Sequence, residues 1–330
     1  MKLFKKILST ALCACMAISL YAGLTGCGSA EADTVIIYSN ADDEAVESMK
    51  KTLDANGYEG KYTFQSFGTS ELGGKLLAEG ADIEADVVTM SSYYIESAQA
   101  QNNMFLDLTF DVNTTDSYPA YYAPFLANQG ALLLNTEVLA EAGLDTPASI
   151  VDLADPQYAG YISVVDIQGS STAWLMIQAL VSEYGADGAK EVLTGIYKNA
   201  GAHLEQSGSG PIKKVRAGEV AIGFGLRHQA VADKADGLPV DFVDPTEGNF
   251  TLTESLAVVN KGEKTNPMAM EMVQCILEKG RADLMTYYPV PLYEGETADA
   301  SAISANSKVF PEALTVELLE QHRALSESCK

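Results

Sequence analysis

The sequence predicts an α/β protein in which two lobes face one cleft. Short runs of β-branched and apolar residues alternate along the chain with amphipathic helical patterns, which is typical of mainly parallel sheets. Two stretches, 62–79 and 161–181, each indicate a strand, a tight turn and the start of a helix. Because these stretches belong to distant parts of the chain, we expect one of them in each lobe.

Small hydroxyl residues stand at both predicted helix starts. Thr69 and Ser70 open the first helix, and Ser170, Ser171 and Thr172 open the second. The first N–H groups of a helix lack internal partners and carry partial positive charge, so hydroxyl residues placed there can cradle an anion. Ser and Thr are also the commonest caps of ordinary helices, and each start alone is explained as a plain cap. Only the pairing favours a site.

The remaining strands and helices follow from the same two signals, a short β-rich run or a 3.6-residue apolar period. Further strands are predicted at 34–38, 85–90, 130–135, 220–225, 240–243 and 255–259. Further helices are predicted at 46–53, 93–101, 137–143, 185–201, 210–218, 267–279 and 311–326. We place the first crossing between lobes near 125–130, and we assign 34–127 with 256–330 to lobe 1 and 128–255 to lobe 2.

The N-terminus has the pattern of a bacterial lipoprotein signal. Lysines occupy positions 2, 5 and 6, an apolar run covers 7–20, and Leu24-Thr25-Gly26-Cys27 matches the cleavage pattern. We predict that residues 1–26 are removed, that Cys27 carries lipid, and that 27–33 form a tether on the extracytoplasmic face of the cell membrane. The alternative is a cleaved secretory signal in which Cys27 is incidental.

Composition narrows the function classes. A formal charge of −24 would repel nucleic acid and anionic lipid, which makes those partners unfavourable. With 47% hydrophobic residues in 330, the chain is large enough for two globular domains. Outside the predicted signal and Cys27, only Cys275 and Cys329 remain, too few for a disulfide framework or a zinc site. A single bridge between these two cysteines is left open.

Enzyme motifs are missing from the sequence. It has no Gly-x-Ser-x-Gly elbow, no Walker A loop and no His-Glu-x-x-His pair, and only His203, His228 and His322 are available for histidine chemistry. A binding protein, acting as a monomer without a cofactor or a resident metal, is therefore the favoured class. A carboxylate-based hydrolase is the alternative, and a cell-surface adhesin or scaffold is a third.

Several segments, taken in order, resemble the extracellular solute-binding proteins of ABC importers. They are Leu24–Cys27, Tyr38-Ser39-Asn40, Gly68–Leu72, Ala85–Val88, Gly169–Trp174 and the turn Asp244-Pro245-Thr246-Glu247-Gly248. The resemblance is to the group related to ferric-ion-binding proteins and spans nearly all of the chain after the signal. It implies a type 2 periplasmic-binding fold: two α/β lobes, joined by two crossings, close on a solute and present it to a membrane permease.

The same resemblance bears on the ligand. Ferric binders of the group carry adjacent tyrosines after the strand equivalent to 220–225, whereas this chain has Leu226-Arg227-His228-Gln229. An Arg-His pair suits an oxyanion, and hexose-phosphate binders are similar in having a histidine there. We therefore expect a small phosphorylated or phosphonate-type anion, with ferric iron as the alternative. The expected ligand-binding residues are Ser39, Asn40, Thr69, Ser70, Ser170, Ser171, Thr172, Arg227, His228 and Glu247.

Two of these roles have plain structural alternatives. Arg227 suits an ion pair with one of many carboxylates equally well, and His228 suits a hydrogen-bonded helix start. Trp174, the only tryptophan, fits a wall of the cleft or, on a helix with Leu175 and Ile177, the core.

Overall fold

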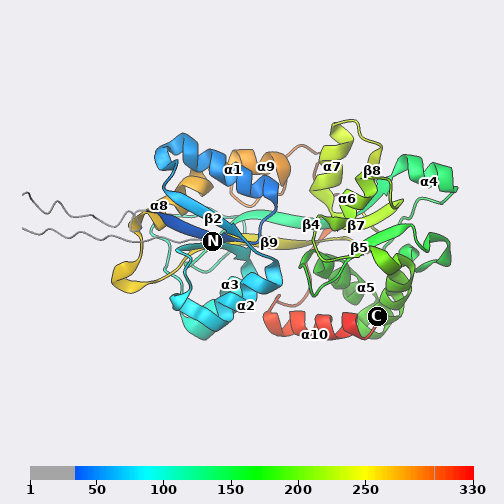
Figure 1. The fold of residues 1–330 in the computed structure, drawn as a ribbon, viewed down its shortest axis with the longest axis horizontal. Helices are drawn as coiled ribbons and strands as arrows, with labels where there is room; N and C mark the ends of the chain where they lie inside the picture. Colours follow the sequence, from blue (N-terminus) through cyan, green and yellow to red (C-terminus); the bar gives the residue numbers. More distant parts are fainter. Residues whose placement is uncertain (1–33, 301) are drawn as a thin grey trace, which may run out of the picture. The chain divides into compact units, whose positions relative to one another are not determined.

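The computed structural model describes residues 34–300 and 302–330. The predicted signal peptide, Cys27 and the tether lie outside the described residues. Within this part of the chain, strands and helices alternate as the sequence predicts, and helices cover both sides of the sheet (Figure 1). None of the helices in these ranges is long and apolar enough to cross a bilayer.

The described residues form one sheet of ten strands. Eight of them follow one hydrogen-bonded path in the order β2-β1-β3-β9-β4-β7-β5-β6, while β8 pairs with β4 and β10 pairs with β9 off this path. Their bounds are β1 Val35–Ser39, β2 Tyr62–Ser66, β3 Val87–Ser91, β4 Ala123–Asn135, β5 Ile162–Val165, β6 Leu204–Glu205, β7 Ile222–Leu226, β8 Val240–Val243, β9 Asn249–Val258 and β10 Ser307–Lys308.

The sheet is mixed, which corrects the expectation of mainly parallel pairing. β1 pairs in parallel with β2 and β3, and β5 with β6 and β7, but β4 and β9 are antiparallel to most of their neighbours. β4 pairs with β9 through residues 123–129 and then with β7 from Gly130 to Leu134. The chain thus passes between two parts of the sheet, one holding β1, β2 and β3 and the other holding β5, β6 and β7, along the long antiparallel strands β4 and β9. Local sequence periodicity could not indicate this pairing.

The α-helices are α1 Asp43–Leu53, α2 Thr69–Glu79, α3 Ser92–Asn102, α4 Thr136–Ala142, α5 Thr172–Ala200, α6 Gly210–Arg216, α7 Arg227–Ala235, α8 Pro267–Cys275, α9 Arg281–Tyr287 and α10 Val316–Glu327. α5 contains a break at Gly185, whose φ of 67° and ψ of 176° are not helical. A positive φ favours glycine. The helical run predicted up to residue 181 and the helix predicted at 185–201 are therefore two segments of α5 that meet at this residue.

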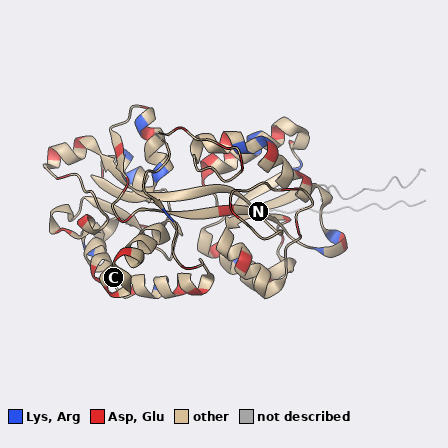
Figure 2. Ribbon diagram, turned by 180° about the vertical axis from the view of Figure 1, so that it is seen from behind, with Lys and Arg blue, Asp and Glu red and all other residues tan. Residues whose placement is uncertain are grey.

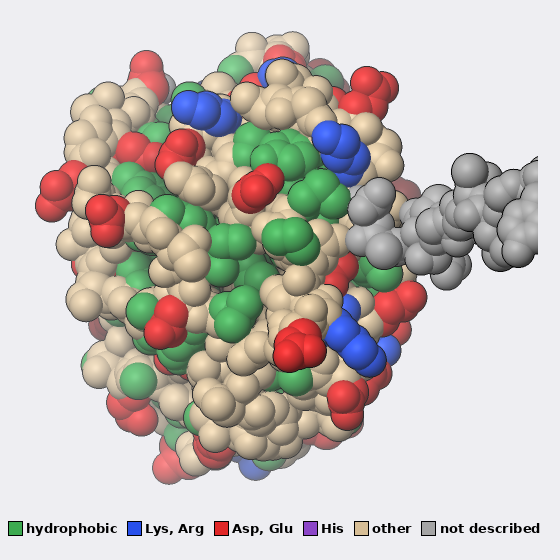
Figure 3. Space-filling view, turned by 90° about the vertical axis from the view of Figure 1, so that its left-hand side faces the viewer, with side chains coloured by type: hydrophobic (Ala, Val, Ile, Leu, Met, Phe, Trp, Pro, Cys, Tyr) green, Lys and Arg blue, Asp and Glu red, His purple; other side chains and the backbone are tan. Residues whose placement is uncertain are grey.

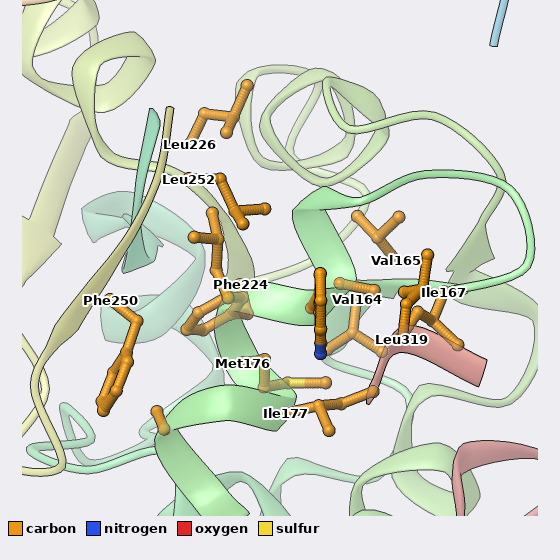
Figure 4. Packing of buried hydrophobic residues seen from close by; sticks show 14 of the residues in the cluster. Val164, Val165, Ile167, Met176, Ile177, Phe224, Leu226, Phe250, Leu252 and Leu319 are labelled. Atoms are coloured by element: carbon orange, nitrogen blue, oxygen red, sulfur yellow. The ribbon is translucent and has the colours of Figure 1, made fainter. Parts of the chain in front are cut away.

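The core of the second part of the sheet packs around the first half of α5. Figure 4 shows side chains from five elements meeting there: Val164 of β5, Met176 and Ile177 of α5, Phe224 of β7, Phe250 of β9 and Leu319 of α10. Trp174 is fully buried in the same cluster, which decides between the two interpretations of this residue in favour of the core. Cys275 and Cys329 are free thiols.

The C-terminal helix α10 contacts helices that cover both parts of the sheet. It packs against α5 and, less extensively, against α3. Trp174 Nε1 donates a hydrogen bond to His322 Nδ1 at 2.7 Å, and Arg323 Nη2 donates to Ser70 Oγ at 2.5 Å. α10 therefore ties the start of α2 to the buried part of α5.

Acidic residues are spread along the chain. They occur on helices around both parts of the sheet (Figure 2), and the face at the α8 end shows acidic, basic and apolar side chains interspersed (Figure 3). The large negative charge thus does not form one acidic patch on these views, and the ligand's charge has to be inferred from its pocket.

Candidate functional site

A cavity of about 360 Å³ lies where β1, β2, β5 and β7 end. Ligands of α/β proteins collect at the carboxyl ends of strands, and a volume of this size suits a small molecule. One wall is formed by the segments after β1 and β2, the other by the segments after β5 and β6, and the floor includes Leu126, Asn128 and Glu254 from β4 and β9.

The structure brings the two predicted helix starts together across this cavity. Thr69 Oγ1 at the start of α2 and Ser171 Oγ before α5 lie 3.5 Å apart. Ser70 Oγ donates a hydrogen bond to the carbonyl oxygen of Gln168 at 3.0 Å, and Asn40 Nδ2 donates to Thr69 Oγ1 at 3.2 Å. Two helix N-termini from different parts of the sheet therefore face one space, where their electrostatic effects add.

Local hydrogen bonds shape the loop before α5. The N–H groups of Gly169 and Ser170 both donate to the carbonyl oxygen of Asp166, and Thr172 N donates to Ser170 Oγ. The loop after β6 closes over it at Gly208, where a Cβ would stand 2.3 Å from Thr172 Oγ1. Only glycine permits this approach, which holds the hydroxyl groups of Ser170 and Thr172 at the cavity wall.

Two basic side chains of α6 line the cavity on the same side as these hydroxyls. Arg216 Nε pairs with Asp233 at 2.6 Å, so part of its charge is neutralised outside the cavity. Lys213 is exposed and has no carboxylate partner among the described residues. Lys213 is thus the cation best placed to meet a bound anion.

The opposite side of the cavity is acidic. Asp42, Asp43 and Glu44 follow β1, and Glu254 on β9 is 3% exposed. Ser91 Oγ donates to Glu254 Oε1 at 2.7 Å. Burial raises the pKa of Glu254 to about 7, although the hydrogen bond from Ser91 favours the ionised form. The carboxyl group therefore titrates near neutral pH at the wall of the cavity.

Of the residues expected at the site, Asn40, Thr69, Ser170, Ser171 and Thr172 line the cavity. Arg227 does not. Its Nε and Nη2 donate to Asp244 at 2.7 and 3.1 Å, and its guanidinium also donates to the carbonyl groups of Ala302 and Ile303. The residue is 4% exposed. Its position after β7 led to the expectation that Arg227 contacts the ligand, but it forms an ion pair with Asp244 from the turn after β8. The ion-pair alternative describes its environment.

Glu247 also lies away from the cavity. It accepts hydrogen bonds from the backbone of Ile150 and Val151, both at 2.9 Å, and from Tyr184.

Ser39 and Ser70 likewise do not line the cavity. Ser39 is buried behind Asn40, where Thr89 Oγ1 donates to its hydroxyl at 2.7 Å. Ser70 Oγ donates to the carbonyl oxygen of Gln168 and accepts from Arg323. Like Glu247, these two side chains support the framework of the loops rather than the cavity surface.

His228 stands directly behind the acidic side of the cavity. Its Nε2 lies 3.7 Å from Asp42 Oδ2, and its ring packs on Tyr288 at 4.3 Å between centroids. Tyr288 donates a hydrogen bond to the same Asp42 oxygen at 3.2 Å. His228 therefore lies beside Asp42 without a hydrogen bond to it, and it does not itself line the cavity.

With this arrangement established, comparison with known proteins identifies the family. Residues 44–290, most of the chain, match the family described as bacterial extracellular solute-binding protein. The chain belongs to this family. An uncharacterized protein of Haemophilus influenzae is 27% identical over 279 residues, which cover 80% of this chain and 79% of the relative. Solute-binding proteins of this kind act outside the cytoplasmic membrane, and they bind small solutes and permease components.

Solved structures agree on the fold. A periplasmic thiamin binding protein superposes with a TM-score of 0.74 at 16% identity, covering 90% of this chain and 95% of that one. Iron-bound HitA from Pseudomonas aeruginosa gives 0.70 at 20% identity, with 90% and 99% covered. AfuA from Actinobacillus pleuropneumoniae, with fructose-6-phosphate bound, gives 0.68 at 21%, with 89% and 94% covered. The type 2 periplasmic-binding fold with two lobes and the resemblance inferred from sequence are thus confirmed.

Several cavity residues of this solute-binding protein carry no motif that sequence reasoning detected. They are Asn128, Gln206, Ser207, Gly208, Ser209, Gln229 and Glu254. The alternation Ser207-Gly208-Ser209-Gly210 is the one local signal that indicates a loop of close backbone approach. Glu254 has no such local sequence signal, because its burial depends on where β9 crosses between the lobes.

Proposed function

We propose that this solute-binding protein captures a small phosphorylated or phosphonate-type solute in the cavity between its lobes and delivers it to an ABC permease. The observation that carries the proposal is the meeting of the α2 and α5 starts, with Thr69 and Ser171 3.5 Å apart, on the side lined by Lys213. Hydroxyl groups, helix-start N–H groups and an unpaired ammonium are together suited to a phosphoryl group.

Ferric iron is the competing ligand within the family. Iron(III) prefers hard phenolate and carboxylate oxygens, yet tyrosine is absent from the described residues that line the cavity. In the described part of the chain, no cluster of three or more histidine, cysteine or acidic side chains has the spacing of a metal site. Both findings support the anion over the metal ion.

Calorimetric titration of the full-length protein tests the choice. We expect binding of at least one member of a panel containing inorganic phosphate, sugar phosphates and phosphonates. Ferric citrate should produce neither heat nor the visible colour of a phenolate complex. A tight coloured ferric complex without any response to the phosphorylated panel would contradict the proposal. Release of a hydrolysed product from any panel member would instead favour the carboxylate hydrolase.

The proposal extends to anchoring and to closure. We propose lipidation at Cys27, lobes divided as 34–127 with 256–330 and 128–255, and a monomer that becomes more compact on binding. Changing Cys27→Ser should release the folded protein from membranes after salt washing, and a variant that stays bound would contradict the anchor. Small-angle scattering with saturating solute should show a smaller radius of gyration at unchanged mass.

A further inference from the structure

Some cavity side chains have polar atoms that no residue in the described part of the chain satisfies. Asn40 Oδ1, Asn128 Oδ1, Gln229 Oε1 and Glu254 Oε2 are buried and have no hydrogen-bond partner among the described residues. A buried polar atom without a partner is costly, and native structures contain few of them. Their gathering at one cavity indicates that a bound molecule supplies the missing partners.

The chemistry of these atoms specifies the partner. All are oxygens that accept hydrogen bonds, so the molecule has to present donors. Glu254 is the most informative, because Ser91 already donates to Oε1 while Oε2 has no partner. Glu254 pairs across the sheet with Ser91 of β3 and Leu126 of β4, which places its carboxyl group at the floor of the cavity.

The charges around the cavity favour a ligand that is more than an anion. Its lining includes the carboxyl groups of Asp42, Asp43, Glu44 and Glu254 but only two basic side chains, Lys213 and Arg216. Arg216 is already paired with Asp233. A phosphoryl group held at the helix starts is therefore balanced on one side, whereas the acidic side still lacks a positive charge.

Taking the proposed phosphoryl recognition as given, we infer that the solute also carries a protonated amine, which binds to Glu254 and the side-chain oxygens of Asn40 and Asn128. The ligand class is then a small zwitterionic amino phosphate, such as an amino sugar phosphate or a phosphorylated amino alcohol. The raised pKa of Glu254 fits this role, because the carboxyl group awaits a cation that would favour its ionised form.

Matched ligand pairs test the inference by calorimetry on the full-length protein. The pairs are glucosamine 6-phosphate with glucose 6-phosphate, and phosphoethanolamine with ethyl phosphate. In at least one pair we expect the amine-bearing member to bind at least about thirtyfold more tightly, a difference of about 2 kcal/mol. Glu254→Gln should abolish that preference, so that the two members of a pair bind with affinities within about threefold of each other. Glu263→Gln, an exposed glutamate outside the cavity, should keep the preference.

The outcomes separate this inference from the proposed function. Equal affinities within both pairs would overturn the amine and leave phosphate recognition standing. A preference that survives in Glu254→Gln would overturn the assignment of the amine to this carboxylate. Binding of free glucosamine or ethanolamine as tight as that of their phosphates would overturn the anionic half. A protein that ignores every phosphorylated probe but binds ferric citrate would overturn both.

Discussion

Trp174 Nε1 donates a hydrogen bond of 2.7 Å to His322 Nδ1, and this contact links the buried start of α5 to the C-terminal helix α10. The bond requires an unprotonated Nδ1, because a protonated imidazole nitrogen cannot accept. Burial lowers the pKa of His322 to about 4, so the ring is neutral at physiological pH. The indole and the imidazole therefore form one pH-dependent element of the core.

We predict that this histidine destabilises the protein as the pH falls. The unfolded chain takes up a proton near the ordinary pKa of 6.5, whereas the folded chain resists until about 4. The stability that the neutral ring contributes is thus present above 6.5 and is lost as pH falls to about 4, by up to about 2 to 3 kcal/mol. Chemical denaturation at several pH values should show that the free energy of unfolding depends less on pH in His322→Asn than in the unaltered protein. His203→Asn, changed in the short 3₁₀ turn before β6, serves as the control.

Glu254 should have the opposite effect on ligand-free protein. Its folded pKa of about 7 exceeds the ordinary value of 4.5, so the folded chain holds the proton more tightly. Stability is then full below 4.5 and falls as pH rises through 7, by about 3 kcal/mol. The free energy of unfolding of Glu254→Gln should therefore equal that of the unaltered protein at pH 4.5 and exceed it at pH 8. Equal stability at both pH values would contradict the raised pKa.

The sequence predicted the local parts of this molecule well. The two strand–turn–helix patterns, whose helices begin at Thr69 and Thr172, are determined by residues adjacent in the chain. They can therefore be predicted from the sequence alone. The pairing of β4 with β9, and the short strands β6 and β10, depend on partners far away in sequence. No local period encodes such pairings, which is why the sheet was expected to be more parallel than it is.

The same distinction explains the site. Ser170, Ser171 and Thr172 were predicted as ligand-binding residues because a helix start has a local sequence pattern, and the structure places them at the cavity. Arg227 was expected at the ligand because it follows a strand, but its environment is set by Asp244, which reaches it from another turn. Glu254 was missed for the converse reason, since an acidic residue in a strand usually faces solvent and only the crossing of β9 buries it.

Arg227 and Lys213 should respond to mutation in contrasting ways. Arg227→Ala removes the charged partner of half-buried Asp244, which among the described residues keeps only the hydrogen bond from Asn249, so we expect about 1 to 3 kcal/mol of lost stability. Affinity for the solute, measured at a temperature where the variant is folded, should change little. A tenfold loss of affinity at unchanged stability would return Arg227 to the ligand site.

Lys213→Ala should do the reverse. Its exposed side chain contributes little to folding, so stability should change by less than about 0.5 kcal/mol. Removing one charge-assisted contact to a phosphoryl group should weaken binding by about tenfold or more. Lys214→Ala is the matched control, because this neighbour on α6 pairs with Glu219 and does not line the cavity. Equal effects of the two lysine changes would argue against Lys213 as the phosphate contact.

Gly208 offers a test of the cavity wall that alters no polar group. A Cβ at this position would stand 2.3 Å from Thr172 Oγ1 and 3.2 Å from Ser170 Oγ, so alanine has to displace the hydroxyls from the start of α5. We expect Gly208→Ala to weaken solute binding by about tenfold, the worth of one good hydrogen bond to an anion. Gly74→Ala is the control, since nothing lies within 4 Å of its added Cβ in α2 and the better helix former should stabilise the protein by about 0.5 to 1 kcal/mol. If Gly208→Ala binds the solute as tightly as Gly74→Ala does, the hydroxyls of Ser170 and Thr172 do not hold the solute, and the phosphoryl group has to be sought nearer to α2 and Lys213.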